Sequence, residues 1–124
     1  MACLDTSVII AFLRGDKDVI DAVNSYEKNE GLSTTSVSEY ELLRHASKLG
    51  TEKVFHIFND ISVYFFDRVA ARKAAEIYRA LQTKGKIINE NDILIAAISV
   101  VNNEVLITRD RKFEYIEGIN LKIL

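Results

Sequence analysis

Apolar residues recur along the chain in short runs that alternate between strand-like and helical spacing. The first run predicts a brief buried strand that ends at Asp5. Thr6 or Ser7 is then expected to cap a helix over residues 8–13. A second helix is predicted to begin after Asp16, where the apolar positions return to helical spacing.

The middle of the chain repeats this alternation. A weaker strand is predicted over residues 32–35, and Ser36 or Ser38 is expected to open the next helix, which Gly50 closes. A short helix is predicted over residues 51–59. Strand and helix therefore alternate once more before the chain reaches its most aromatic stretch.

The β-branched and aromatic run over residues 61–66 predicts a strand, and Asp67 is expected to cap the longest helix, which runs to about Thr83. The predicted inner face of that helix consists of Val69, Ala70, Ala74, Ile77, Tyr78 and Leu81. Most of the nearby aromatic residues are expected in the core, and a dimer or partner surface is the alternative for some of them; they are Phe55, Phe58, Tyr64, Phe65 and Phe66.

The helix predicted from Asn91 to residue 101 is apolar almost all round, so it should run through the middle of the domain. Asp92 stands in its first turn, where the positive end of the helix dipole is expected to keep the carboxylate ionised. A strand over residues 104–108 and an alternating edge strand over residues 119–124 complete the pattern.

Alternating strands and helices predict a parallel sheet with helices on both faces. The 124 residues, of which 48% are hydrophobic and 27% charged, suffice for one domain over residues 1–124 and not for two. In such sheets, binding and catalysis gather at the carboxyl ends of the strands.

The net charge of −2 argues against a protein that holds nucleic acid by bulk positive charge, although it allows a local basic rim. The single cysteine, Cys3, cannot form an internal disulfide and is expected to be a small core residue. No signal-like segment and no uninterrupted apolar run of about 18 residues occurs. We therefore expect a soluble, cytoplasmic protein.

Four acids occupy positions that a parallel sheet would bring together. Asp5 ends the first strand, Asp110 follows the strand over residues 104–108, Glu41 lies on the helix after the second strand, and Asp92 begins the central helix. Each has an ordinary alternative role as a helix cap, a turn former or a surface charge. Their joint placement, rather than any single residue, indicates a site.

Four carboxylates in one cleft repel each other, and a divalent cation removes that repulsion. Oxygen ligands without a nearby Cys or His cluster suit Mg²⁺ or Mn²⁺ rather than zinc. Such ions activate water and offset charge on a phosphodiester, so the pattern favours metal-assisted phosphodiester hydrolysis. Glu39 competes with Glu41, because the two point to opposite sides of one helix and only one can face the cleft.

The sequence resembles the PIN-domain ribonucleases of the VapC toxin type from end to end. The matching segments are Leu4-Asp5-Thr6-Ser7-Val8-Ile9-Ile10, Thr35-Ser36-Val37-Ser38-Glu39-Tyr40-Glu41-Leu42-Leu43, Asn91-Asp92-Ile93-Leu94-Ile95-Ala96-Ala97 and Leu106-Ile107-Thr108-Arg109-Asp110-Arg111-Lys112-Phe113. Two positions depart from the usual pattern: Ser7 stands where Asn is frequent, and His45 where Gly is common. Neither departure removes a carboxylate.

The resemblance implies a three-layer α/β/α sandwich with a central, mostly parallel sheet. It also implies that Asp5, Glu41, Asp92 and Asp110 are the catalytic residues and bind Mg²⁺ or Mn²⁺. An RNA substrate, a homodimer and a small neutralising antitoxin protein are further expectations from the family.

Several other side chains are candidates around these acids. Thr6 and Thr108 are expected to hydrogen-bond the carboxylates and fix their rotamers, as outer groups do around metals. A helix cap and a strand-end hydroxyl are their ordinary alternatives. The possible RNA contacts are Arg14, Lys86, Arg109 and Arg111.

Two rival functions remain to be weighed against a ribonuclease. A non-catalytic PIN-like module that binds RNA or protein is less favoured, because a decayed site would be expected to lose an acid and all four are present. A phosphoacceptor receiver domain would have an acid pair after the first strand and a Lys after a late strand. Here Asp5 stands alone and Thr108-Arg109-Asp110 replaces the Lys pattern.

Overall fold

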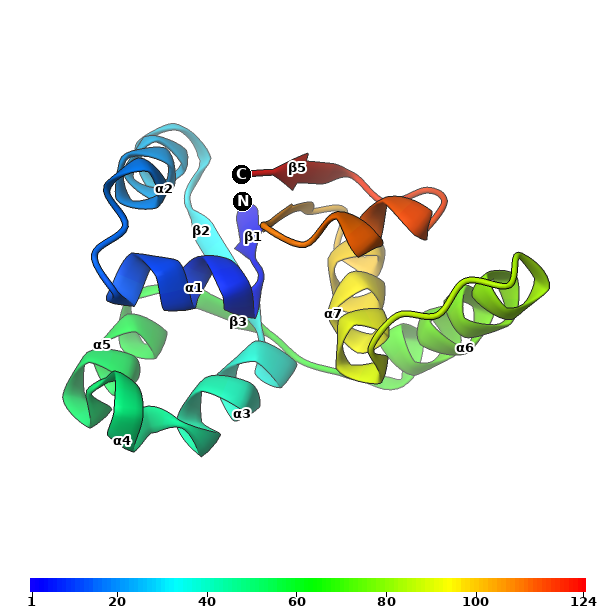
Figure 1. Cartoon of the computed structure of the whole chain (residues 1–124), viewed down its shortest axis with the longest axis horizontal. Coiled ribbons are helices and arrows are strands. Elements are labelled where there is room, and N and C mark those ends of the chain that lie inside the picture. The colour runs from blue at the N-terminus through cyan, green and yellow to red at the C-terminus, as the bar shows by residue number, and fades with distance from the viewer.

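Five parallel strands form one sheet at the centre of the molecule, in the order β3-β2-β1-β4-β5 (Figure 1). The structure is a computed structural model that describes all residues from 1 to 124. The strands are β1 (Ala2–Leu4), β2 (Leu32–Thr35), β3 (Ser62–Tyr64), β4 (Val105–Thr108) and β5 (Leu121–Ile123). The predicted sheet is confirmed, and it is parallel throughout.

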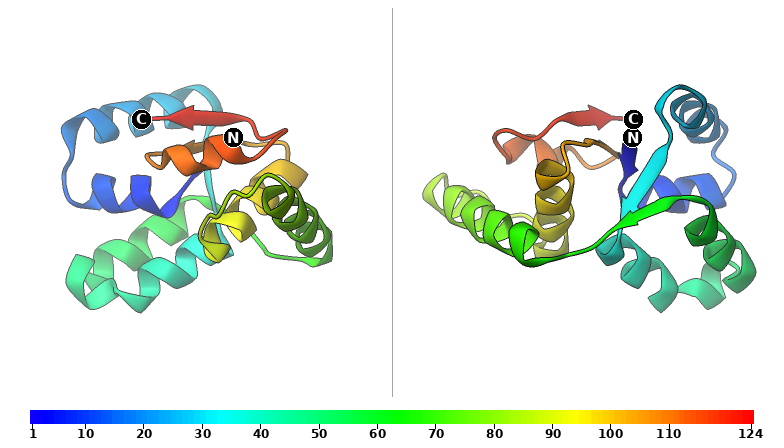
Figure 2. Two further views of the ribbon diagram at one scale, coloured as in Figure 1. Left: turned by 45° about the vertical axis from the view of Figure 1, so that its right-hand side comes forward. Right: turned by 180° about the vertical axis from the view of Figure 1, so that it is seen from behind.

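Helices cover both faces of the sheet, which confirms the three-layer α/β/α arrangement (Figures 1 and 2). The helices before residue 61 form one layer, and α6 and α7 form most of the other. The helices are α1 (Thr6–Leu13), α2 (Lys17–Glu30), α3 (Ser36–Arg44), α4 (Ala46–Leu49), α5 (Thr51–Asp60), α6 (Arg68–Thr83) and α7 (Glu90–Val101), with a 3-10 helix η1 (Arg111–Tyr115). No helix is both long enough and apolar enough to cross a lipid bilayer.

Alternation along the central strands divides the core into two parts. Leu4 and Ile107 pack with the first five helices, whereas Cys3 and Leu106 pack with α6, α7 and η1. Cys3 is fully buried, as predicted for a small core residue. Because both faces of β1 and β4 are covered, the middle of the sheet is fixed tightly from both sides.

Helix α7 has the buried character that its apolar sequence predicts. Ile93 and every residue from 95 to 99 are buried. Asn89 caps its first turn through a bond from the Asn91 amide to Asn89 Oδ1 at 2.9 Å. The helix ends at Asn102, and Asn103 takes the left-handed conformation with φ 54°. The first turn of α7, which carries Asp92, is therefore held by a rigid core element.

One predicted helix cap was wrong by a short distance, because Asp5, rather than Thr6 or Ser7, caps α1. Helix α3 opens at Ser36, one of the two residues predicted to open it, and Thr35 caps it. Asp5 directly follows β1, Thr35 is the last residue of β2, and both have extended backbone angles. An extended residue at this point lets its side-chain oxygen accept a hydrogen bond from the next turn.

The helix predicted to run from Ser36 or Ser38 to Gly50 is interrupted. His45, with φ −117° and ψ 21°, leaves the helical conformation and separates α3 from α4. The strand predicted over residues 61–66 is also shorter, because only residues 62–64 pair with β2. The following segment leaves the sheet and leads to α6, which Asp67 caps as predicted.

Several aromatic and aliphatic residues predicted for the core are exposed. Phe55, Phe65 and Phe66 are 53%, 71% and 40% exposed. On α6, the buried stripe consists of Ala70, Ala74, Ile77 and Leu81. That stripe keeps strict helical spacing, so Val69 and Tyr78 turn outward, contrary to their predicted place on the inner face.

Candidate active site

The four acids lie around the point where the strand order reverses. From β1 the chain crosses to β2 on one side, and it later returns to place β4 on the other side of β1. Asp5 directly follows β1, and Asp110 comes two residues after β4. Ligands of open parallel sheets bind at such reversal points, outside the carboxyl ends of the strands.

Asp5 is almost completely buried, with 3% of its surface exposed. Its Oδ1 accepts a hydrogen bond from the Thr6 amide at 2.8 Å. Its Oδ2 accepts from Thr108 Oγ1 at 2.6 Å and from Ser7 Oγ at 3.0 Å. Burial raises the pKa of Asp5, and the charge of Glu41 raises it further, although the three hydrogen bonds act in the opposite direction. These donors fix the orientation of the carboxylate.

Glu41 faces Asp5 across the gap between α3 and α1. Thr6 Oγ1 donates a hydrogen bond to Glu41 Oε1 at 2.7 Å, so one residue contacts both carboxylates. Glu39 lies on another side of α3, beside Tyr40 and Arg44. The structure therefore places Glu41, and not Glu39, with the other acids.

The pKa of Asp92 is raised as well. Burial raises its pKa to about 7, together with the negative charges of Asp5, Asp110 and Glu41. Lys112 acts against this shift but does not cancel it. Burial and the three neighbouring acids therefore act against the helix dipole, which favours the ionised carboxylate by at most about 2 kcal/mol.

Asp110 both shapes its own turn and joins the cluster. Its Oδ1 accepts a hydrogen bond from the Lys112 amide at 2.9 Å, which caps η1. Its own amide donates to Thr108 Oγ1 at 3.1 Å. Thr108 thus connects Asp5 and Asp110 through one buried hydroxyl. The predicted contacts of Thr6 and Thr108 with the carboxylates are present.

The donor set suits a hard divalent cation. Its ligating atoms are carboxylate oxygens, and the half-buried Asp92 carboxylate accepts no hydrogen bond and has no ion pair, although three acids face it. No three acidic, His or Cys side chains converge tightly enough to form a preformed coordination cage. Mg²⁺ typically uses one or two carboxylates and retains several waters, so this looser arrangement fits it.

The basic residues predicted to contact RNA fall into different surroundings. Arg109 pairs with Asp16 at 3.4 Å. Both residues line an open surface groove, and Arg14 lines it too. Arg111 pairs with Glu114 on its own 3-10 helix at 2.8 Å. The remaining candidate, Lys86, stacks its ammonium over the Tyr115 ring at 4.7 Å from the centroid.

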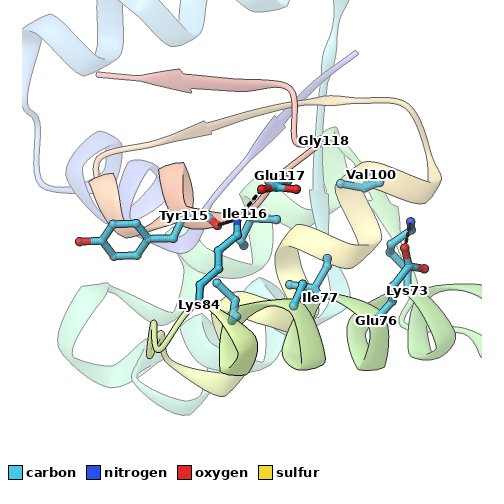
Figure 3. Close-up of a pocket in the computed structure, with 11 residues that line it drawn as sticks. Lys73, Glu76, Ile77, Lys84, Val100, Tyr115, Ile116, Glu117 and Gly118 are labelled. Atoms are coloured by element: carbon cyan, nitrogen blue, oxygen red, sulfur yellow. Dashed lines mark hydrogen bonds and ion pairs between the residues drawn. The ribbon is translucent and has the colours of Figure 1, made fainter.

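A separate pocket of about 180 Å³ lies between α6, α7 and the segment after η1 (Figure 3). Lys84 Nζ pairs there with Glu117 at 2.8 Å and donates to the Tyr115 carbonyl at 3.4 Å. The hydrogen bond from Lys84, together with its positive charge, lowers the pKa of Glu117. None of the four clustered acids lines this pocket, and the Lys84 contacts link the end of α6 to Tyr115 and Glu117.

Ser7 shares the role predicted for its neighbour Thr6. It donates to Asp5 and accepts from the Arg109 amide at 3.3 Å, so it links β1 to the segment after β4. Asp16 pairs with Arg109, which is 93 positions away in the chain, and no local sequence pattern predicts this contact.

Comparison with known proteins agrees with this geometry. The family model described as "PIN domain" matches residues 2–119. The chain is 32% identical to Ribonuclease VapC3 of Methanocaldococcus jannaschii over 97 residues, which cover 78% of this chain and 96% of that protein. It is 27% identical to Ribonuclease VapC1 of the same organism over 122 residues, with 97% and 84% covered.

Solved structures share the fold. VapBC2 from Rickettsia felis, bound to a DNA fragment from its promoter, matches with a TM-score of 0.88 and 22% identity over 99% of this chain and 98% of that chain. VapBC-5 from Mycobacterium tuberculosis matches with a TM-score of 0.76 and 25% identity, over 99% and 96%. From the match along residues 2–119 and the 32% identity to a VapC ribonuclease, this chain belongs to the PIN-domain family and, within it, to the VapC-type ribonucleases.

Proposed function

We propose that this chain is a Mg²⁺- or Mn²⁺-dependent endoribonuclease that acts as the toxin of a toxin–antitoxin pair. One observation carries the metal dependence: Asp92 is half-buried, has no hydrogen-bond or ionic partner, and faces Asp5, Asp110 and Glu41. A site of this kind is unfavourable for the folded protein unless a cation neutralises it. The names of the related ribonucleases support RNA as the substrate.

The side chains of the site have two roles: some would hold the cation, and others orient the carboxylates. When bound, a divalent ion supplies activation of water and offsets charge on the phosphodiester in the transition state. Asp5, Glu41, Asp92 and Asp110 are the residues that would hold it. Thr6, Ser7 and Thr108 keep the Asp5 and Glu41 carboxylates in fixed orientations, which reduces the reorganisation needed during the reaction.

A pair of variants on one helix tests the proposal. Glu41→Gln is expected to reduce RNA cleavage by about 100-fold or more, because it removes a charge from the acidic cluster. Glu39→Gln, two residues away on the same helix, should cleave as the unmodified chain does, since Glu39 lies apart from the cluster. Cleavage of single-stranded RNA is measured with Mg²⁺ or Mn²⁺, and EDTA should abolish it. Equal activity of the two variants, or full activity in EDTA, would contradict the proposed site.

We also propose that two copies of the chain associate through exposed apolar residues on α3, the segment after β3 and the first turn of α6. Tyr40, Phe65 and Val69 are 57%, 71% and 61% exposed. The Phe66 amide donates to Ser36 Oγ at 3.2 Å, which holds this segment against the start of α3. Contiguous exposed apolar residues of this kind usually mark an interaction surface.

A second apolar surface supports an antitoxin partner. A groove of about 240 Å³ lies between α1, α2 and α5, with Ile9, Phe12 and Ile57 among its apolar lining and Glu27 and Asp60 at its edge. Its shape suits the apolar face of a partner helix with basic residues beside it. The similar structures named above are VapBC assemblies, which supports a VapB-like protein as the occupant.

Reciprocal variants separate these two surfaces. Phe65→Ser is expected to shift the purified chain from dimer to monomer in analytical ultracentrifugation while leaving antitoxin binding intact. Phe12→Ser should weaken binding of the protein encoded by a small reading frame beside this one, without changing the dimer. If Phe65→Ser remains dimeric, the proposed dimer surface is wrong, and if Phe12→Ser binds the partner fully, the groove is not its site.

A further inference from the structure

An open groove of about 540 Å³ lies beside the acidic cluster, where α1, the turn before α2 and the segment after β4 meet. Arg14, Gly15 and Asp16 line it from the turn, and Arg109 lines it from the other side. Gly15 has φ +84°, and a side chain added there would meet no atom within 4 Å, so the groove is unobstructed at this point. Two arginines from distant parts of the chain therefore share one open concavity.

Ser7 connects this groove to the proposed catalytic carboxylates. Its Oγ donates to Asp5 Oδ2 at 3.0 Å and accepts from the Arg109 amide at 3.3 Å. Ser7 itself also lines the groove. A polymer phosphate held between the arginines would thus lie one side chain away from the acidic cluster.

The arginines of the groove have little internal compensation. Arg109 Nη1 lies 3.4 Å from Asp16 Oδ2, with both side chains substantially exposed, and exposed pairs of this length are weak. Asp16 Oδ1 is already used as the cap of α2, where it accepts from the Val19 amide at 3.2 Å. Arg14 has no carboxylate within 4 Å, so its guanidinium is free to bind an external anion.

We propose that Arg14 and Arg109 form a phosphate subsite that binds an RNA phosphate next to the one being cleaved, and that this phosphate replaces Asp16 as the partner of Arg109. The inference rests on the proposed ribonuclease function. Arginine suits the role because its planar guanidinium makes paired hydrogen bonds to phosphate oxygens. A chain with a net charge of −2 needs such local cations to attract a polyanion to an acidic site.

The test measures RNA binding separately from cleavage. Each variant is made in an Asp92→Asn background, and its affinity for a labelled single-stranded RNA is followed by fluorescence anisotropy over a range of salt concentrations with Mg²⁺ present. Arg14→Gln and Arg109→Gln should each weaken binding by roughly tenfold. Together they should reduce the slope of log K against log salt by about 0.7, the value for one phosphate on a single strand.

Asp16→Asn gives the opposite and more diagnostic result. Asparagine caps a helix as well as aspartate does, so α2 should be retained. The competing charge beside Arg109 is removed, and RNA should therefore bind several-fold more tightly. If the ion pair between Arg109 and Asp16 were only structural, Arg109→Gln and Asp16→Asn would both bind RNA less tightly.

Arg72→Gln on α6 serves as the matched control, because it removes the same charge without altering the groove. If Arg14→Gln and Arg109→Gln weaken RNA binding only as much as Arg72→Gln does, the subsite is overturned. The ribonuclease proposal is left intact by that result. The subsite is also overturned if the two groove variants bind an oligoglutamate peptide less tightly but bind RNA as tightly as the unmodified chain does. In active chains the arginine variants should raise KM more than they lower kcat. If the unmodified chain neither binds nor cleaves RNA, the ribonuclease proposal and the subsite both fail.

Discussion

Asp92→Asn is expected to stabilise the metal-free protein by about 1–2 kcal/mol at pH 8 while abolishing RNA cleavage. Burial and three neighbouring acids raise the pKa of Asp92 to about 7 in the folded chain. An aspartate in the unfolded chain titrates near 4. A shift of this direction means that ionising Asp92 costs folded-state stability. The full shift would correspond to about 4 kcal/mol, and solvent screening of this partly exposed group reduces it.

The sign of the pH dependence follows from the two pKa values. Below about pH 4 the carboxyl group is protonated in both states, and Asp92 has no effect of this kind on stability. Between about pH 4 and 7 the unfolded chain loses its proton while the folded chain retains it, so stability falls as the pH rises. Above pH 7 the loss is complete. The stabilising effect of Asp92→Asn should therefore be small at pH 4 and largest above pH 7.

Urea denaturation in EDTA at pH 4.5 and pH 8 measures this difference. Glu90→Gln is the matched control, since Glu90 lies in the same first turn of α7 but is exposed. Millimolar Mg²⁺ should then stabilise the unmodified chain more than the Asp92→Asn variant, because a ligand that binds only the folded state adds its binding free energy. Destabilisation by Asp92→Asn at both pH values would show that the acid is structurally satisfied rather than strained.

Thr108→Val is expected to destabilise the fold by about 2–3 kcal/mol and to reduce cleavage strongly. The valine has nearly the same shape but lacks the hydroxyl that donates to Asp5 at 2.6 Å and accepts from the Asp110 amide at 3.1 Å. Both groups would lose a partner, and the Asp5 carboxylate is buried. A hydrogen bond to a charged group contributes about 1.5–3 kcal/mol, and an unsatisfied buried group adds to the cost.

Thr108→Ser distinguishes the hydroxyl from its surroundings. It retains the donor and the acceptor and removes one methyl group from a fully buried position, which should cost about 1 kcal/mol. Cleavage by Thr108→Ser should thus remain near that of the unmodified chain, whereas Thr108→Val should lose most of it. Thermal unfolding and initial cleavage rates measure the two effects. Similar rates for the serine and valine variants would exclude an orienting role for the hydroxyl.

The local chemistry of the chain predicts much of the fold. Asp16 and Asp67 cap the two helices that were predicted to begin after them. The cap of α1 was misplaced because only Asp5 separates β1 from that helix. Asp5 still has extended backbone angles, and a pattern of apolar positions cannot resolve whether Asp5 or a neighbour carries the cap.

Long-range contacts account for what the sequence did not predict. The pattern placed Asp5, Glu41, Asp92 and Asp110 near one edge, but it did not predict that Arg109 pairs with Asp16, 93 positions away. The exposure of Phe65 depended on where β3 stops pairing with β2. Such features arise from tertiary packing, which intrinsic propensities do not describe.

The position of β4 beside β1 has a consequence for biosynthesis. Residues 2–4 pair with residues 105–107, so β1 cannot complete its strand pairing until β4 has been synthesised. Until β4 arrives, Asp5 lacks the Thr108 hydroxyl and Asp110 has no fixed place. Such distant pairings form late because closing a long loop is entropically costly. The acidic cluster is thus incomplete on every nascent chain that has not yet reached β4.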